Sequence, residues 1–204
     1  TKSSPWTMAI TQDWMFADNA TTFGVSLELS QIRGQVGWVM TASNEFGILG
    51  AFRAKNSSEL GVSRGAPAGS APDLVVSTQA MNHVSAYWHH KWSQNGANTI
   101  ISIGIPEKSR ANGDGSLGDF LATATVKVPF TSKVGFFGNI MYMNPTAQPG
   151  FEAGHEDTWS FTLGIEIFPG GDARTKTIAG ERWMPMLPVA NNGIFLQDAA
   201  TRPR

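Results

Sequence analysis

Apolar and polar residues alternate one by one along much of the chain, which is the pattern of a β-strand with one apolar and one polar face. The clearest stretch runs from Phe120 to Phe130, and Trp159–Ile167 and Phe23–Ser30 alternate in the same way. In the first stretch one face holds Phe120, Ala122, Ala124, Val126, Val128 and Phe130, and the other holds Leu121, Thr123, Thr125, Lys127 and Pro129. These stretches predict strands that each turn one apolar face away from water.

Six further stretches alternate more weakly: Trp6–Ile10, Val36–Met40, Phe46–Ala54, Val84–Trp92, Ile100–Pro106 and Val134–Asn144. This makes about nine strands, to which Leu74–Gln79 could add a tenth, and no helical pattern is comparably strong. The sequence therefore predicts an all-β fold, an antiparallel up-and-down β-barrel of about nine or ten strands over residues 1–168. After Phe168 the alternation stops, and residues 169–204 are predicted to be an irregular tail punctuated by Pro and Gly.

The connections between the predicted strands alternate in length from the third strand onward. Three are short: Ser43–Glu45, Asn95–Gly96 and Thr131–Lys133. Three are long: Lys55–Asp73, Glu107–Gly118 and Asn144–Asp157. Because successive connections of an up-and-down sheet lie at opposite ends, one end should carry short turns and the other long loops. The segment Gln31–Gly34 is too short for the turn that this scheme needs there, so the pattern is imperfect.

Strands with one apolar face suit either a soluble sandwich with a shared core or a membrane barrel whose apolar face meets lipid. Only 15% of the residues are charged, against roughly 25% in an average soluble domain, and the polar faces carry mostly Ser, Thr, Gly and Asn. Strands of this length also match the ~9–11 residues that cross a bilayer when tilted. Aromatic residues lie near strand ends: Trp6, Trp14, Phe16, Phe46, Trp88, Trp92, Phe120, Phe130, Tyr142, Trp159 and Phe168. The membrane barrel is the favoured interpretation.

Several classes of protein are excluded or disfavoured by composition. A net charge of −1 argues against nucleic acid as a partner, since duplex binders usually carry a basic excess. The absence of Cys excludes disulfides, thiolate nucleophiles and Cys-ligated zinc. No apolar run reaches the ~18–20 residues of a transmembrane helix. No glycine-rich loop between a strand and a helix suggests a nucleotide cofactor.

The run His83-Val84-Ser85 is the one candidate for nucleophilic chemistry. It resembles the catalytic element of outer-membrane lipid deacylases, in which the His would deprotonate the Ser and a carboxylate would orient the His. Glu107 or Asp119 would have to supply that carboxylate. Ala86 departs from the Asn that usually follows the Ser in that family. We therefore favour two polar, lumen-facing side chains, and expect no catalytic residues and no enzymatic activity.

The histidines and one acidic loop were the candidates for metal binding. His83 and His89 share a strand face with Tyr87 and Lys91, while His90 points to the other face. No spacing indicates a third ligand, and Lys91 would oppose a cation. The loop Ala111–Asp119 has some features of a Ca²⁺ loop but lacks the regular ligands and the closing Glu. The sequence thus predicts neither a metal site nor a cofactor.

Four segments in the C-terminal third carry a family resemblance: Gly135–Asn139, Asp157–Ser160, Phe168–Arg174 and Trp183–Leu196. They resemble an uncharacterised planctomycete outer-membrane β-barrel-like protein family. The resemblance implies an envelope-associated barrel, located in the cell outer membrane or the extracellular envelope, and brings no catalytic residues with it. The apolar segment Trp183–Leu196 needs a partner, so the tail is expected to plug the barrel or to dock on a neighbouring subunit.

We therefore expect an envelope β-barrel with a structural or pore-forming role. Its partners would be membrane lipid and other copies or envelope subunits, without nucleic acid. Two alternatives remain: a soluble β-sandwich that assembles into a surface layer, fibre or shell or binds carbohydrate, and an outer-membrane lipid hydrolase that uses His83 and Ser85.

Overall fold

The computed structural model describes residues 5–18, 26–61, 74–92, 96–107, 118–144, 158–169 and 197–203. These residues form eleven strands: β1 (Trp6–Ala17), β2 (Leu27–Thr41), β3 (Asn44–Lys55), β4 (Ser57–Gly61), β5 (Leu74–Ala80), β6 (His83–Lys91), β7 (Asn98–Pro106), β8 (Phe120–Pro129), β9 (Val134–Asn144), β10 (Thr158–Ile167) and β11 (Gln197–Pro203). They include no helix that could cross a membrane.

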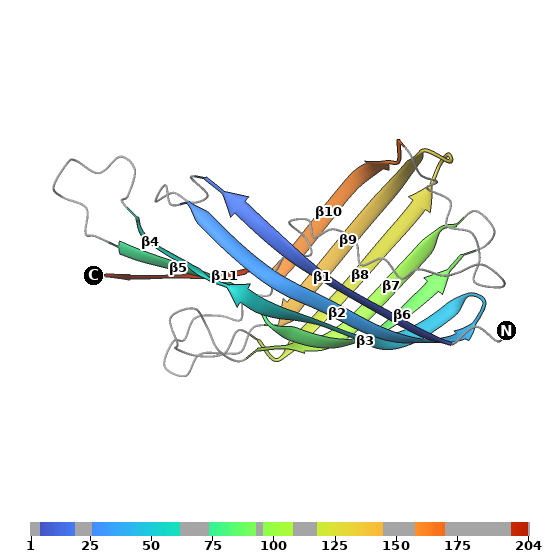
Figure 1. Cartoon of the computed structure of the whole chain (residues 1–204), viewed down its shortest axis with the longest axis horizontal. Helices are drawn as coiled ribbons and strands as arrows, with labels where there is room; N and C mark the ends of the chain where they lie inside the picture. Colours follow the sequence, from blue (N-terminus) through green and yellow to red (C-terminus); the bar gives the residue numbers. More distant parts are fainter. Residues whose placement is uncertain are drawn as a thin grey trace.

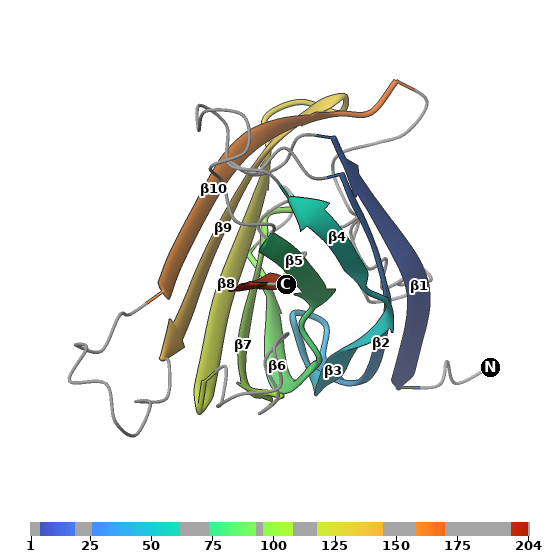
Figure 2. The same cartoon turned by 90° about the vertical axis from the view of Figure 1, so that its left-hand side faces the viewer.

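Eight of the strands form one antiparallel sheet in the order β1-β2-β3-β6-β7-β8-β9-β10. The sheet curls strongly into an open trough, with β1–β2 and β8–β10 as its two walls (Figures 1 and 2). Its strands are 9 to 15 residues long. The antiparallel, barrel-like fold predicted from the alternation is confirmed. Among the described residues, β1 pairs only with β2 and β10 only with β9, so both are edge strands.

The remaining three strands form a smaller sheet in the order β11-β5-β4. β4 follows β3 after the single residue Asn56, and β5 leads into β6 through Met81 and Asn82. The small sheet therefore prolongs the β3–β6 pair, and Figure 1 shows it projecting from one end of the trough. β5 also contacts β2 and β3.

The strand count differs from the prediction of nine or ten strands in one barrel. Phe23–Ser30 and Val36–Met40 were expected to be separate strands, but both contribute to β2, which continues through Gln31–Gly34 without a turn. The reason is that the apolar residues change faces along β2. Leu27 and Leu29 point into the trough, whereas Ile32, Val36, Trp38 and Met40 are exposed on its outside. In the sequence, this switch of the apolar residues from one face to the other therefore resembles the end of one strand and the start of the next.

Two further predictions on strands are refined by the structure. Leu74–Gln79 does form a strand, β5, but this strand belongs to the small sheet. Within the tail predicted to be irregular, Gln197–Pro203 forms β11 and pairs with β5 from Gln197↔Ala80 to Pro203↔Leu74. The apolar segment Trp183–Leu196, which was predicted to plug the barrel or to dock on a neighbouring subunit, lies outside the described residues.

The arrangement of the connections follows the prediction except that the predicted long connection Lys55–Asp73 contains strand β4. The β2–β3 and β8–β9 connections are short turns at one end of the sheet, where Phe130 and Thr131 donate backbone hydrogen bonds to Val134. In the β6–β7 connection Gly96 has φ 79°, the positive value expected for the Asn95-Gly96 turn. The connections β1–β2, β7–β8 and β9–β10 leave from the opposite end. We call the two ends the short-turn end and the long-loop end.

Candidate functional site

The outer, convex face of the large sheet is apolar. Among the described residues, 25 large apolar side chains are exposed, whereas 12 of the 20 buried side chains are polar or charged. This distribution is the reverse of that in a water-soluble domain, which buries its large apolar side chains and pairs or exposes its polar ones. The outer face is thus largely apolar, and we call it the outer band. It is far larger than the scattered apolar residues that soluble proteins expose.

Aromatic side chains border the outer band at the short-turn end. Trp6, Trp38, Phe46 and Trp88 are paired directly in register across β1, β2, β3 and β6. The rings of Trp6 and Trp38 pack edge to face with centroids 4.7 Å apart, and Phe46 stacks on Trp88. The indole N–H of Trp88 donates a hydrogen bond of 3.0 Å to Asn44. Trp88 thus combines an apolar body with a hydrogen-bonded polar edge.

A second aromatic border lies at the long-loop end. The ring centroid of Tyr142 is 4.7 Å from that of Trp159 and 6.4 Å from that of Phe120. Trp14 and Phe16 stack on each other near the end of β1. The two borders enclose a middle zone of the outer band that is mainly aliphatic: Met8, Ile10, Ile32, Val36, Ile48, Val84, Ile101, Ile103, Ile105, Ile140, Leu163 and Ile165.

The apolar face of β8 belongs to the outer band. Ala124 pairs with Ile101 on β7 and with Ile140 on β9, and both isoleucines are exposed. Residues paired directly across an antiparallel sheet lie on the same face. Ala122, Ala124, Val126 and Val128 therefore face outward, and Lys127 lies on the inner face, where its Nζ is 2.8 Å from Glu166 Oε1.

The inner, concave face holds hydrogen-bonded polar clusters. Glu45 is 1% exposed, and its Oε1 accepts hydrogen bonds from the hydroxyl groups of Thr7 and of Tyr87, the latter at 2.7 Å. The Nδ1 of His89 lies 3.4 Å from the other carboxylate oxygen. This Glu45 cluster joins β1, β3 and β6. The two hydroxyl groups satisfy Oε1 of a carboxylate that would be costly to bury without partners.

Two glycines make room for the Glu45 cluster. Gly37 and Gly47 are paired in register on β2 and β3, and Tyr87 pairs with Gly47 from the other side. A Cβ atom at Gly37 would overlap Glu45 Oε1, the Tyr87 hydroxyl and Thr7 Oγ1, and one at Gly47 would lie 2.6 Å from Cε1 of Tyr87. The glycines therefore form the surface over which the Tyr87 ring lies.

We expect Gly37→Ala to destabilise the folded protein, because overpacking of a filled interior typically costs about 1–3 kcal/mol. Gly34→Ala on the same strand is the matched control, since a Cβ there would meet its nearest neighbour, the Ala9 carbonyl oxygen, at 3.8 Å. Denaturant unfolding of both variants measures the difference. Equal stabilities of the two variants would contradict the packing described for Glu45 and Tyr87.

A second inner cluster contains a buried ion pair between β1 and β2. The guanidinium of Arg33 donates to both carboxylate oxygens of Asp13, with Nε–Oδ2 at 2.5 Å and Nη2–Oδ1 at 3.1 Å. The side chains are 8% and 7% exposed. The amide of Gln31 adds a hydrogen bond of 3.3 Å to the same carboxylate. This bidentate geometry is the strong form of an Arg–carboxylate pair.

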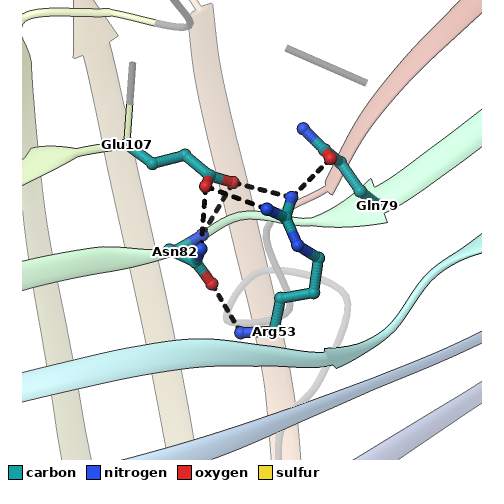
Figure 3. Close-up of polar contacts among 4 residues, drawn as sticks. All are labelled: Arg53, Gln79, Asn82 and Glu107. Carbon is teal, nitrogen blue, oxygen red and sulfur yellow. Dashed lines mark hydrogen bonds and ion pairs between the residues drawn. The ribbon is translucent and has the colours of Figure 1, made fainter. Parts of the chain in front are cut away.

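A third cluster lies where the small sheet leaves the trough (Figure 3). Arg53 on β3 contacts both carboxylate oxygens of Glu107, at 2.9 and 3.1 Å, and also donates to the side chain of Gln79 on β5. The side chain of Asn82 donates to Glu107 at 2.7 Å and accepts from the backbone N–H of Arg53 at 2.5 Å. This cluster fixes β5 against the ends of β3 and β7.

The residues considered for hydrolysis are not assembled into a catalytic set. The Oγ of Ser85 and the Nδ1 of His83 are buried, and neither has a hydrogen-bond partner among the described residues. Glu107 is held by Arg53 and Asn82 rather than by His83. Asp119 is exposed and lies directly before β8. A nucleophilic Ser needs a hydrogen bond to its base, and no such bond is present between these side chains.

The histidines lie on the faces that the alternation predicted. His83, Tyr87, His89 and Lys91 occupy the inner face of β6, and His90 lies on the outer face, where its Nδ1 is 2.9 Å from Asn44 Oδ1. Within the described ranges, no group of three or more His, Asp or Glu side chains could hold a metal ion. The loop Ala111–Asp119 is described only at its last two residues, so the Ca²⁺ hypothesis falls mostly outside the described residues.

The inner clusters were not predicted individually. Single charges on polar strand faces, such as Asp13, Arg33 and Glu45, were the available signal in the sequence. Their pairing depends on strand register, which alternation alone does not specify. The role of Gly37 and Gly47 depends on register in the same way.

A model of a protein family, described as a family of unknown function (DUF6666), matches residues 2–197. No curated protein and no solved structure matches the chain. The family match includes all eight strands of the large sheet, whereas the resemblance carried by short motifs covered only the C-terminal third. The chain therefore belongs to the DUF6666 family.

Proposed function

We propose that this chain forms the wall of a membrane-spanning β-barrel in a cell envelope, with a structural or pore-forming role and no catalysis. The observation that carries the proposal is the reversed distribution of side chains, apolar outside and polar inside. Lipid is the solvent that suits such an outer face, because it neither hydrogen-bonds nor excludes apolar side chains. A soluble β-sandwich would instead bury this face against a second sheet.

The aromatic borders and the strand lengths support the same proposal. Trp and Tyr concentrate at membrane–water interfaces, where a ring can lie in the apolar layer with its polar atom near water. The two borders of the outer band have this composition, with Trp6, Trp38 and Trp88 at one end and Tyr142 and Trp159 at the other. The eight strands have at least 9 residues, which suffices for a tilted crossing of a bilayer.

The ends of the trough suggest its orientation in the envelope. Outer-membrane barrels have short turns on the periplasmic side and longer loops on the cell surface. We therefore place the short-turn end, with the β2–β3 and β8–β9 turns, on the inner side of an outer membrane. The long-loop end and the small sheet would face the exterior. The resemblance to the planctomycete envelope family agrees with this localisation, which remains part of the proposal.

Tryptophan fluorescence tests the proposal. After refolding into vesicles, we expect quenching by lipids brominated near the headgroups to exceed quenching by lipids brominated near the bilayer centre, because the outward-facing Trp6, Trp38 and Trp159 lie at the borders of the outer band. A protein that stays monodisperse in water without detergent, and whose fluorescence neither lipid quenches, would disprove the proposal.

A further inference from the structure

In the large sheet formed by the described residues, β1 and β10 are the two edge strands. In lipid an unpaired strand edge is unfavourable, since no water is present to hydrogen-bond its free backbone N–H and C=O groups. If the chain spans a membrane, as proposed above, these edges need strand partners. We propose that the partner is a second copy of this chain, so that two eight-stranded troughs form one sixteen-stranded barrel.

Strand direction permits this pairing. β1 and β10 are the first and eighth strands of a sheet in which every neighbouring pair is antiparallel. The first and last strands of an even-numbered antiparallel sheet run in opposite directions, so β1 of one copy pairs antiparallel with β10 of the other. Both junctions of the two-copy ring are then equivalent, which gives the two-fold symmetry most common among homo-oligomers.

The outward-facing residues of β1 and β10 also match in their positions along the strands. β1 begins with Trp6 at the short-turn end and ends with Trp14 and Phe16 at the long-loop end. β10 runs the other way, from Trp159 at the long-loop end to Ile167 at the short-turn end. Antiparallel pairing therefore places Trp14 and Phe16 beside Trp159 and continues the aromatic border across the junction.

The contents of the trough favour a second copy over closure of β1 onto β10 of the same chain. A closed barrel of about eight strands has room for little more than its own side chains. Here Ala80 and Met81 also lie against the inner face, where Ala80 packs with Leu29 and Met81 packs with Leu121. The rest of the small sheet projects beyond the end of the trough (Figure 1). Barrels of about sixteen strands enclose an aqueous channel, which leaves room for such residues.

Disulfide cross-linking tests this arrangement, because the chain has no Cys of its own. One population carries Ile10→Cys on β1, and a second, with a longer affinity tag, carries Leu163→Cys on β10. Both positions are mid-strand and outward-facing. The two populations are refolded together into lipid vesicles and oxidised. Parallel experiments use Phe161→Cys or Ile165→Cys in place of Leu163→Cys, so that three registers between β1 and β10 are tested. We expect a mixed-tag dimer for at least one pairing. Ile48→Cys, on the doubly paired β3, should give none with Leu163→Cys.

The double variant Ile10→Cys/Leu163→Cys in one chain separates the possible outcomes. A disulfide within the monomer, without dimer, would overturn the second copy in favour of closure by the chain's own edge. Absence of any cross-link at all tested pairings, in protein shown by brominated-lipid quenching to be inserted, would also overturn it and would leave the membrane-spanning role intact. Absence of insertion would overturn both.

Discussion

Replacing Ile48 with Arg is expected to weaken folding into lipid vesicles by more than about 1 kcal/mol, because the cost of an Arg on the lipid face rises from about 0–1 kcal/mol near the interfaces to about 2–4 kcal/mol at the bilayer midplane. Ile48 is 61% exposed on the outer face of β3, between the border residue Phe46 and Phe52. In water an exposed Ile-to-Arg change should cost almost nothing. The size of the loss in folding free energy therefore shows whether lipid or water surrounds the outer band. A denaturant titration of folding in vesicles measures it.

Ser132→Arg is the control for this prediction. Ser132 is exposed in the β8–β9 turn, at the end of the sheet and beyond the outer band. We expect it to change stability by about 0–1 kcal/mol, the range for charges near the membrane interface. If Ile48→Arg is as harmless as Ser132→Arg, the outer band faces water or a protein surface that admits a charge, and the proposed function fails.

Arg33→Met is expected to destabilise the protein by about 3–5 kcal/mol, because it leaves the Asp13 carboxylate buried without its charged partner. The two side chains are 8% and 7% exposed, so water offers little compensation. Equilibrium unfolding measures the effect. The double variant Asp13→Leu/Arg33→Met should recover most of the loss, since well-packed apolar residues often replace a buried ion pair without cost.

Lys127→Met is the matched control for a pair on the same inner face. Lys127 and Glu166 are each 30% exposed, and pairs open to solvent contribute about 0–1 kcal/mol. A loss for Arg33→Met no greater than that for Lys127→Met would show that the interior near β1 and β2 is hydrated. In that case the trough would be an open, water-lined surface rather than a packed polar interior at this position.

The alternation of the sequence was sufficient to predict the all-β, antiparallel, barrel-like fold. It also placed Ala122, Ala124 and Val126 correctly on a single face of β8, and His83 and His89 opposite His90 on β6. These features depend only on the period of two along a strand. The short turns followed from local chemistry, as at Gly96 with its positive φ.

What the sequence could not provide depends on contacts between distant residues. β2 was divided because Leu29 faces the inner core near Ala80 while Ile32 faces outward, and alternation cannot distinguish such a switch from a turn. β11 has few apolar residues and is defined by its pairing with β5. The Glu45 cluster joins residues 38 and 42 positions apart, so it appears only once the register is known.

The most direct measurement of the central claim is the accessibility of spin labels placed one at a time from Phe120 to Phe130 in protein refolded into vesicles. The outward positions Ala122, Ala124, Val126 and Val128 should be accessible to oxygen, which concentrates in lipid, and protected from a water-soluble nickel chelate. The inward positions Thr123, Thr125 and Lys127 should be less accessible to oxygen. This two-residue period is the result that the account predicts. Nickel accessibility at the outward positions, or loss of the period, would contradict it.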